Sequence, residues 1–322
     1  MKFPKKKAIL ENAKIDFVNI DNIITASKKE RASKIFGYIL IKYPDSNDII
    51  LLKEGEPLTA ARLTGNLRKI VPIEEAVNKA KTASTGLISV YETAPEIIRM
   101  LFSTFKEKPI FRDKDVSEVD IVKLIKKLIE LKYSGFFELR KGVFFSYVIF
   151  KKGYAKLGFF QDKLAVPLSN EEFLKILLKA SEKEGLKITA YKEMVSDDEQ
   201  AAPSAVSLFI KVITELSKKI SVVVGDSLAK RTMSMAFDKA GERYDWINQF
   251  KVKGLSVTGT VIVSSKELAK GFSYLVKQMI EFYKPILGDR IDNIVKDSIK
   301  DYRFALKNMG FYMQYGMDKY EQ

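Results

Sequence analysis

Two serine–lysine pairs are the first candidates for chemistry in this sequence. Ser103 precedes Lys106, and Ser227 precedes Lys230, by the three-residue spacing of some serine hydrolases. In that class the lysine assists the serine, and the motifs Ser-Asp-Asn and Lys-Thr-Gly complete the site. Neither companion motif occurs here, and a chain rich in lysine and serine produces such pairs by chance. We therefore predict no catalytic residue.

The amino-acid composition excludes several other kinds of catalytic and metal-binding site. The 322 residues include no cysteine and no histidine, which excludes disulfides, zinc fingers, cysteine nucleophiles and imidazole acid–base catalysis. Neither glycine-rich phosphate-loop motif is present. The run Val222–Gly225 predicts a strand and turn before a helix capped by Asp226 or Ser227. We expect no cofactor.

Paired carboxylates are the remaining candidates for a metal site. Asp289 with Asp292, and Asp297 with Asp301, lie one helical turn apart. Basic residues alternate with them along the chain, so these patterns favour surface ion pairs over metal binding. No calcium-loop spacing occurs. We expect no metal ion.

Aromatic and cationic residues near the C-terminus could contact a partner. Trp246, the only tryptophan, follows Arg243 and Tyr244, and the group could form a stacking platform or an interface anchor. The aromatic tail from residue 310 would be adhesive if exposed, or would close the core if folded back, and both alternatives stay open. The candidate partner-contact residues are Trp246, Tyr244, Arg243, Phe311, Tyr312 and Tyr315.

The elements around these residues include a repeat. Gly37 and Gly55 are 18 residues apart, as are Gly135 and Gly153, and each pair begins and ends a strand-like stretch. A third glycine, Gly86 or Gly185, precedes a further strand that ends in tyrosine. This register predicts a duplicated small domain.

The second copy has the clearer pattern. Residues 117–120 and 169–172 resemble capping boxes, each at the start of an amphipathic helix. Three strands are expected at residues 136–139, 143–150 and 154–160. In the first copy we expect a helix near residue 20, strands at 38–43 and 49–52, and a helix after Pro72.

The last third of the chain is predicted to be mostly helical. Its expected elements are helices at residues 209–220, 228–240, 268–279 and 291–309, with a strand at 253–263 and helix breaks at Pro285 and Gly288. The apolar stripes of these helices could form a homodimer interface or pack within one subunit, and short stripes favour the second.

Together these patterns predict an α+β protein with two similar small modules, each an antiparallel sheet with helices, followed by a mostly helical C-terminal domain. The predicted boundaries are a basic arm with the first module at 1–107, the second module at 108–192, an acidic linker at 193–204 and the helical domain at 205–322.

Overall composition indicates a folded protein without a membrane span. Hydrophobic residues make up 46% and charged residues 30%, and no long apolar run or secretory signal occurs. We expect a cytoplasmic location, and the absence of cysteine with abundant lysine, glutamate and isoleucine is typical of thermophilic proteins. The net charge of +14 could serve nucleic-acid binding, but scattered basic residues favour a solvated surface.

Three segments of the second module carry a family resemblance: Ser134–Leu139, Val148–Ala155 and Gly185–Ile188. Through them the second module resembles the PATAN type of domain, and the first module matches more weakly through Gly37–Ile41 and Ile49–Glu56. The whole-chain layout is similar to uncharacterised prokaryotic, mainly archaeal, proteins. This resemblance implies a role in protein interactions within signalling or surface-motility systems and implies no catalytic residues.

Three functions remain as hypotheses. The first is a non-catalytic adaptor or regulatory scaffold that binds protein partners, which the duplicated module favours. The second is a basic protein associated with nucleic acid. The third is an enzyme that uses carboxylate or lysine chemistry.

Overall fold

The computed structural model describes residues 1–29, 35–65, 67–161, 163–181, 185–192 and 200–321. The chain forms two compact units. The first comprises Met1–Val71 with Ala76–Asp197, and the second comprises Asp198–Gln322 with Pro72–Glu75. The fold is α+β, as predicted, with two six-stranded antiparallel sheets in the first unit and a mostly helical second unit.

Both modules have the same topology. The strand orders are β1-β6-β2-β3-β4-β5 and β7-β12-β8-β9-β10-β11. The first module contains β1 (Lys7–Lys14), α1 (Ile20–Lys29), β2 (Gly37–Lys42), β3 (Asn47–Lys53), β4 (Glu56–Thr64), β5 (Leu67–Val71), α2 (Ile73–Thr82) and β6 (Leu87–Glu92). The second contains β7 (Phe111–Asp115), α4 (Ile121–Glu130), β8 (Gly135–Lys141), β9 (Phe144–Lys151), β10 (Tyr154–Phe160), β11 (Lys163–Pro167), α5 (Asn170–Ser181) and β12 (Leu186–Lys192).

The first glycine of the repeat, Gly37 or Gly135, has the same physical role in both copies, and with the shared topology this confirms the predicted duplication. A Cβ atom on Gly37 would overlap the carbonyl oxygen of Tyr91 on the neighbouring strand, and one on Gly135 would overlap that of Tyr191. A side chain at either position would push the central strands apart. The repeat therefore preserves a close contact between β2 and β6 and its counterpart between β8 and β12.

A second pair of equivalent positions is not apparent from the sequence. Asn12 and Asp113 both have φ of 50°, in the left-handed region that asparagine and aspartate tolerate better than most residues. The backbone N–H of Asn12 donates to the hydroxyl of Ser89 at 2.9 Å, and that of Asp113 donates to the hydroxyl of Thr189 at 3.0 Å. Each copy thus bends its first strand at the same point with the same support.

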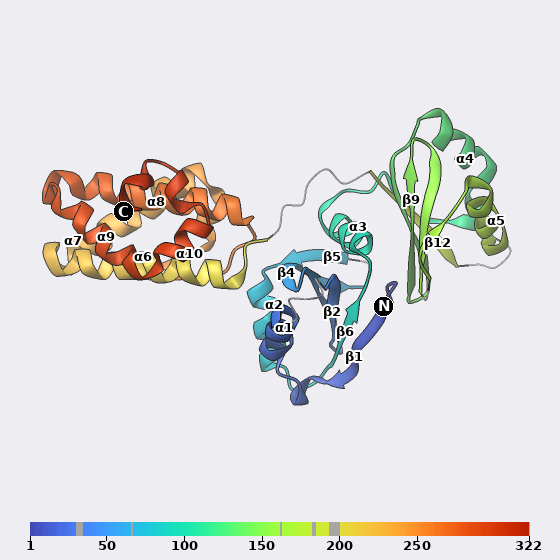
Figure 1. Ribbon diagram of the computed structural model, residues 1–322, viewed down its shortest axis with the longest axis horizontal. Helices are drawn as coiled ribbons and strands as arrows, with labels where there is room; N and C mark the ends of the chain where they lie inside the picture. Colours follow the sequence, from blue (N-terminus) through green and yellow to red (C-terminus); the bar gives the residue numbers. More distant parts are fainter. Residues whose placement is uncertain (30–34, 66, 162, 182–184, 193–199, 322) are drawn as a thin grey trace. The chain divides into compact units, whose positions relative to one another are not determined.

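The two sheets share one core through α3 (Pro95–Lys106), the helix between the modules. One face of each sheet contributes to this core, together with the buried face of α3. In the second module, the other face of the sheet packs on α4 and α5 (Figure 1). The buried members of the shared core include Phe3, Tyr38, Leu40, Ile49, Leu51, Tyr91, Ile97, Leu101, Phe136, Phe145, Tyr147, Phe159 and Tyr191. Burial of both sheets in one core explains why the modules form a single unit.

The second unit is a helical bundle with its own core. Its elements are α6 (Pro203–Val224), α7 (Asp226–Arg243), the hairpin β13 (Lys251–Lys253) and β14 (Ser256–Thr258), α8 (Ser265–Leu287), α9 (Arg290–Ile299) and α10 (Arg303–Asn308), followed by 3₁₀ turns at Phe311–Met313 and Met317–Tyr320. The predicted stripe Phe209, Ile213, Leu216 and Ile220 is buried in this core.

Two predicted helix starts have different outcomes. The capping box of residues 169–172 is confirmed, because the backbone N–H of Glu172 donates to the Ser169 hydroxyl at 3.2 Å and its carboxylate accepts from the Ser169 N–H at 2.7 Å. The prediction of a capping box at residues 117–120 is wrong. Ser117 belongs to a 3₁₀ turn, and Asp120 caps α4 by accepting from the N–H of Lys123 at 2.9 Å.

Several predictions for the second unit are wrong in detail. The expected strand at residues 253–263 is only the short hairpin, because Gly254 has a left-handed φ of 64° that turns the chain. Val222–Val224 form the end of α6 and no strand. The N-cap residue of α7 is Gly225, whereas the sequence predicted Asp226 or Ser227.

Two helix boundaries in this unit also differ from the predictions. Pro285 lies inside α8, which continues to Leu287, since a proline near a helix end removes a single backbone hydrogen bond. The helix expected at residues 291–309 is divided into α9 and α10 by a 3₁₀ turn.

The predicted linker falls mostly outside the described residues. Residues 193–199 are not described, and α6 already begins at Pro203, inside the range 193–204. Gln200 forms an isolated bridge with Ser264, and the N–H of Ala201 donates to the carbonyl of Val263 at 2.6 Å. The end of the expected linker is therefore part of the second unit's structure.

Candidate functional site

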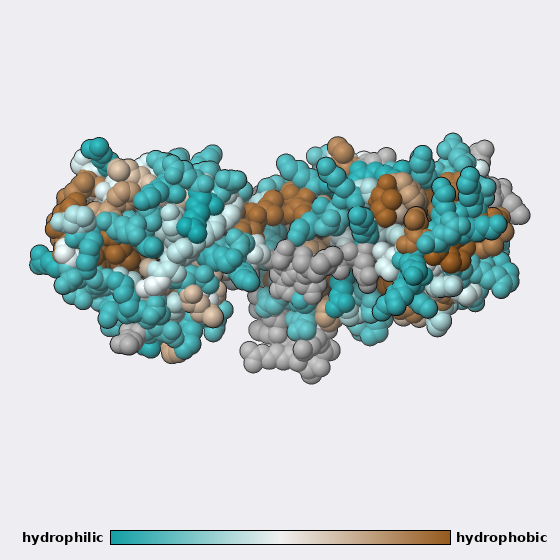
Figure 2. Space-filling view, turned by 90° about the horizontal axis from the view of Figure 1, so that it is seen from above, coloured by the Kyte–Doolittle hydropathy of each residue, from teal (hydrophilic) through white to brown (hydrophobic). Residues whose placement is uncertain are grey.

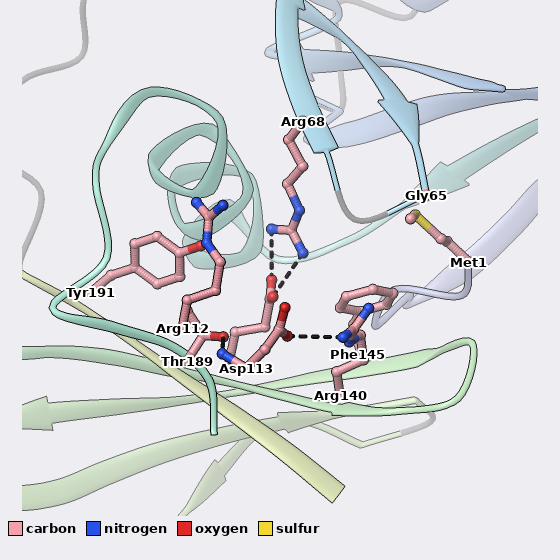
Figure 3. Close-up of a pocket in the computed structure, with 10 residues that line it drawn as sticks. Met1, Gly65, Arg68, Arg112, Asp113, Arg140, Phe145, Thr189 and Tyr191 are labelled. Atoms are coloured by element: carbon pink, nitrogen blue, oxygen red, sulfur yellow. Dashed lines mark hydrogen bonds and ion pairs between the residues drawn. The ribbon is translucent and has the colours of Figure 1, made fainter. Parts of the chain in front are cut away.

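A buried ion pair joins the two modules of the first unit (Figure 3). Arg68 on β5 donates two hydrogen bonds to Glu138 on β8, at 2.9 Å and 2.7 Å. The Tyr147 hydroxyl donates to the same carboxylate at 3.0 Å. The Glu138 side chain is only 4% exposed, so these donors replace the water that a carboxylate would otherwise bind. In the first copy Leu40 occupies the position equivalent to Glu138, three residues after the aligned glycine.

Further charged groups line a small cavity beside this pair (Figure 3). Arg140 donates to Asp113 at 2.9 Å, while Arg112 is exposed and has no ion pair with any residue that the structure describes. Burial, and then the negative charge of Glu138, raise the pKa of Tyr191 to about 12. These hydrogen bonds and ion pairs join most polar groups of the cavity to one another, and such an arrangement is suited to fixing the position of one module against the other.

A second cluster lies on the helical unit and contains predicted partner-contact residues. The guanidinium of Arg243, at the end of α7, lies 4.9 Å from the ring centre of Tyr274, 5.2 Å from that of Tyr315 and 6.0 Å from that of Tyr244. These distances are within the range of cation–π attraction. Within the described parts of the chain, Arg243 forms no ion pair with a carboxylate. We call Arg243, Tyr244, Tyr274 and Tyr315 the Arg243 cluster.

The tyrosines of the Arg243 cluster hold one another in place. The hydroxyl groups of Tyr244 and Tyr315 are hydrogen-bonded at 2.5 Å. Burial, and then this hydrogen bond, raise the pKa of Tyr244 to about 12. Trp246 packs at the edge, 6.3 Å from Tyr244 between ring centres, and covers Gly271, where any side chain would overlap the indole ring. The cation is thus presented on a rigid aromatic base.

The structure separates the six predicted partner-contact residues into two groups. Arg243, Tyr244 and Tyr315 meet in the Arg243 cluster, with Trp246 beside them. Phe311 and Tyr312 are buried in the helical core, so the tail folds back and these two side chains are not accessible to a partner. Sequence reasoning missed Tyr274, because the packing of α7 on α8, and no sequence spacing, brings it to Arg243.

Both serine–lysine pairs lie within helices, Ser103 and Lys106 on α3 and Ser227 and Lys230 on α7. Ser103 is fully buried in α3, and its hydroxyl has no hydrogen-bond partner among the described residues. Lys230 forms an ion pair with Asp226 at 3.3 Å. Asp292 accepts hydrogen bonds from Lys284, Lys319 and Tyr320, so it forms ion pairs as predicted, although with other partners than its neighbours in the sequence. Among the described residues, no cluster of three acidic side chains could hold a metal ion.

The surface is mixed. Figure 2 shows hydrophilic side chains over much of one face, interrupted by smaller hydrophobic patches. Phe304 and Met313 on the second unit are more than four-fifths exposed. Within the described residues, every helix is too short or too polar to cross a membrane.

Comparison of the chain with protein-family models, with curated proteins and with solved structures finds no match. The candidate sites therefore depend on the geometry described above.

Proposed function

We propose that this protein is a non-catalytic adaptor that binds an acidic partner protein through the Arg243 cluster. The observation that carries the proposal is an exposed arginine held on three tyrosine rings without a carboxylate partner in the described residues. An acidic side chain or chain terminus of a partner would complete its hydrogen bonding.

The composition of the cluster supports this function. Arginine, tyrosine and tryptophan are the residues that most often dominate the energy of protein interfaces. The tyrosines lose little conformational freedom on binding because their neighbours already hold them. The net charge of +14 favours association with an acidic surface. The resemblance of the second module to PATAN domains, which are associated with protein interactions, agrees with an adaptor role.

The experiment compares proteins captured from a native lysate by the tagged wild type and two variants. Arg243→Ala removes the cation of the cluster, and Arg231→Ala removes an exposed arginine elsewhere on α7 as a matched control. Loss of an interface arginine of this kind weakens binding about tenfold or more. We expect acidic proteins that wild type and Arg231→Ala capture and Arg243→Ala does not. Equal capture by all three would contradict the proposal.

The same cluster supports nucleic-acid binding as a second candidate. Tyrosine faces and an arginine can stack on bases, and the positive charge would attract phosphates. Capture that disappears after nuclease treatment, and binding that weakens steeply with salt, would favour this candidate over the adaptor.

A further inference from the structure

A pocket in the first unit combines lysines with aromatic side chains. Its cavity volume is about 230 Å³, smaller than the sites of drug-sized ligands, so its occupant must be small. Its walls come from the N-terminal stretch with β1, from β2 and β6 of the first module, and from Phe144 on β9 and Gln161 after β10 in the second. The lining residues used below are Lys2, Lys5, Glu11, Asn12, Tyr38, Lys42, Tyr91 and Phe144.

The positive charge in this pocket is not balanced by its own residues. Among the described lining residues, Glu11 is the only acid, and it is already bound by Lys5 at 2.9 Å and by the Tyr91 hydroxyl at 3.0 Å. Lys42 donates to the neutral amide of Asn12 at 3.2 Å, and Lys2 lies 5.2 Å from the ring centre of Phe144. In the described parts of the chain, neither Lys2 nor Lys42 forms an ion pair with an acid, although Lys5, Tyr91 and Lys2 all lower the pKa of Glu11.

Comparison with the second module shows which residues differ around Lys42. The cavity of Figure 3 lies at the equivalent place, where Arg140 and Asp113 correspond to Lys42 and Asn12. There the aspartate neutralises the arginine at 2.9 Å, whereas Asn12 leaves the charge of Lys42 intact. Glu138 likewise has the neutral Leu40 as its counterpart. The second copy also has Arg112 where the first has Glu11, so these equivalent positions carry no net charge in either copy. The surplus positive charge of the first pocket therefore comes from Lys2 and Lys5.

The walls of the pocket are rigid and the field within it is positive. The buried Tyr38 hydroxyl donates to the carbonyl of Phe3 at 3.2 Å, and its ring lies 5.1 Å from that of Tyr91 between centres. Cations that converge in front of a low-dielectric wall attract anions more strongly than isolated surface lysines do.

We propose that this pocket binds a small phosphate-bearing molecule. A phosphate carries enough negative charge to engage Lys2 and Lys42 together, and lysine is a common point-charge ligand of phosphate. The aromatic rim at Phe144 and Tyr91 would contact the body of the molecule. This site is separate in sequence and structure from the Arg243 cluster and does not depend on its function.

The test uses pyrophosphate as the probe and isothermal titration calorimetry of the full chain at low ionic strength. Asn12→Asp places the acid of the second copy beside Lys42 and should weaken binding about tenfold, because it neutralises a charge at contact distance. The fold should tolerate it, since Asp113 has the same φ and the same backbone hydrogen bond. Asn12→Gly, which also suits this φ, is the neutral control and should stay within a few-fold of wild type.

Two more variants make the prediction independent of position 12. Lys42→Met should weaken pyrophosphate binding about tenfold, while Lys163→Met, at an exposed lysine on β11, should leave it unchanged. Pyrophosphate that does not bind, or binds wild type, Asn12→Asp and Lys42→Met equally, would overturn the proposal. An oligonucleotide that binds more tightly than pyrophosphate and loses its affinity in Lys42→Met would assign the pocket to nucleic acid instead, which also overturns it.

Discussion

Replacing Arg68 by alanine is the sharpest test of how the two modules are held together. The substitution leaves the Glu138 carboxylate, 4% exposed, with the Tyr147 hydroxyl as the only remaining hydrogen-bond donor described above. Removing one partner of a buried ion pair strands the other charge and costs about 3–5 kcal/mol of unfolding free energy. Arg68 also lies 5.5 Å from the ring centre of Phe145, so its loss removes packing in addition.

The double variant Arg68→Leu with Glu138→Leu separates the stranded charge from the loss of contacts. Leucine is the residue of the first copy at the position of Glu138, and replacement of a buried pair by apolar residues is often neutral or stabilising. We therefore expect the double variant to lose no more than about 1 kcal/mol, far less than Arg68→Ala.

The assay is urea denaturation of the full chain followed by far-ultraviolet circular dichroism. Trp246 lies in the second unit, so its fluorescence provides a separate signal from that unit in the same samples. Hydrogen exchange would place the destabilisation in β5 and β8. A loss below about 1 kcal/mol for Arg68→Ala, or a double variant as unstable as the single one, would refute a buried pair that depends on both partners.

Two further predictions concern the glycines and the C-terminal tail. Gly135→Ala should destabilise the first unit by about 2 kcal/mol or more in the same urea assay, because its Cβ would overlap the Tyr191 carbonyl. The control Gly142→Ala, at a turn with open space around it, should cost only about 1 kcal/mol. Equal losses of stability in the two variants would contradict this reasoning. Burial raises the pKa of Asp292, but hydrogen bonds from Lys319, Tyr320 and Lys284 outweigh it and hold that pKa well below its usual range. The stabilisation is therefore present above the unfolded pKa of about 3.9 and is lost as the pH falls below that value. Asp292→Asn should be less stable than wild type by about 1–2 kcal/mol at pH 5–7, and this difference should shrink below about pH 4. A difference in melting behaviour that stays constant down to pH 2 would exclude this linkage.

The sequence predicts those parts of the fold that depend on local chemistry. The glycine register locates the duplicated modules, because close contacts between strands exclude a Cβ at Gly37 and Gly135. The Ser169 capping box and the apolar stripe of α6 are likewise local patterns. Asp120 was missed as the helix cap because Ser117, three residues earlier, fits the same motif.

The candidate sites depend on tertiary contacts that no spacing encodes. Arg68 and Glu138 are 70 residues apart in sequence and meet only because the modules share a core. Tyr274 reaches Arg243 through the packing of two helices. The aromatic tail has the composition of an adhesive surface, yet Phe311 is buried because left-handed glycines at 310 and 316 fold the segment back onto the bundle.

The most direct test of the adaptor function is photocrosslinking from the edge of the Arg243 cluster. A benzophenone amino acid replaces Lys277, whose amino group lies 5.9 Å from the ring centre of Tyr315, or the exposed Lys253 as the control position. The adaptor proposal predicts a discrete acidic protein crosslinked from position 277, absent from position 253, and retained after nuclease treatment. Crosslinks that are equal at the two positions, or that disappear with nuclease, would contradict it.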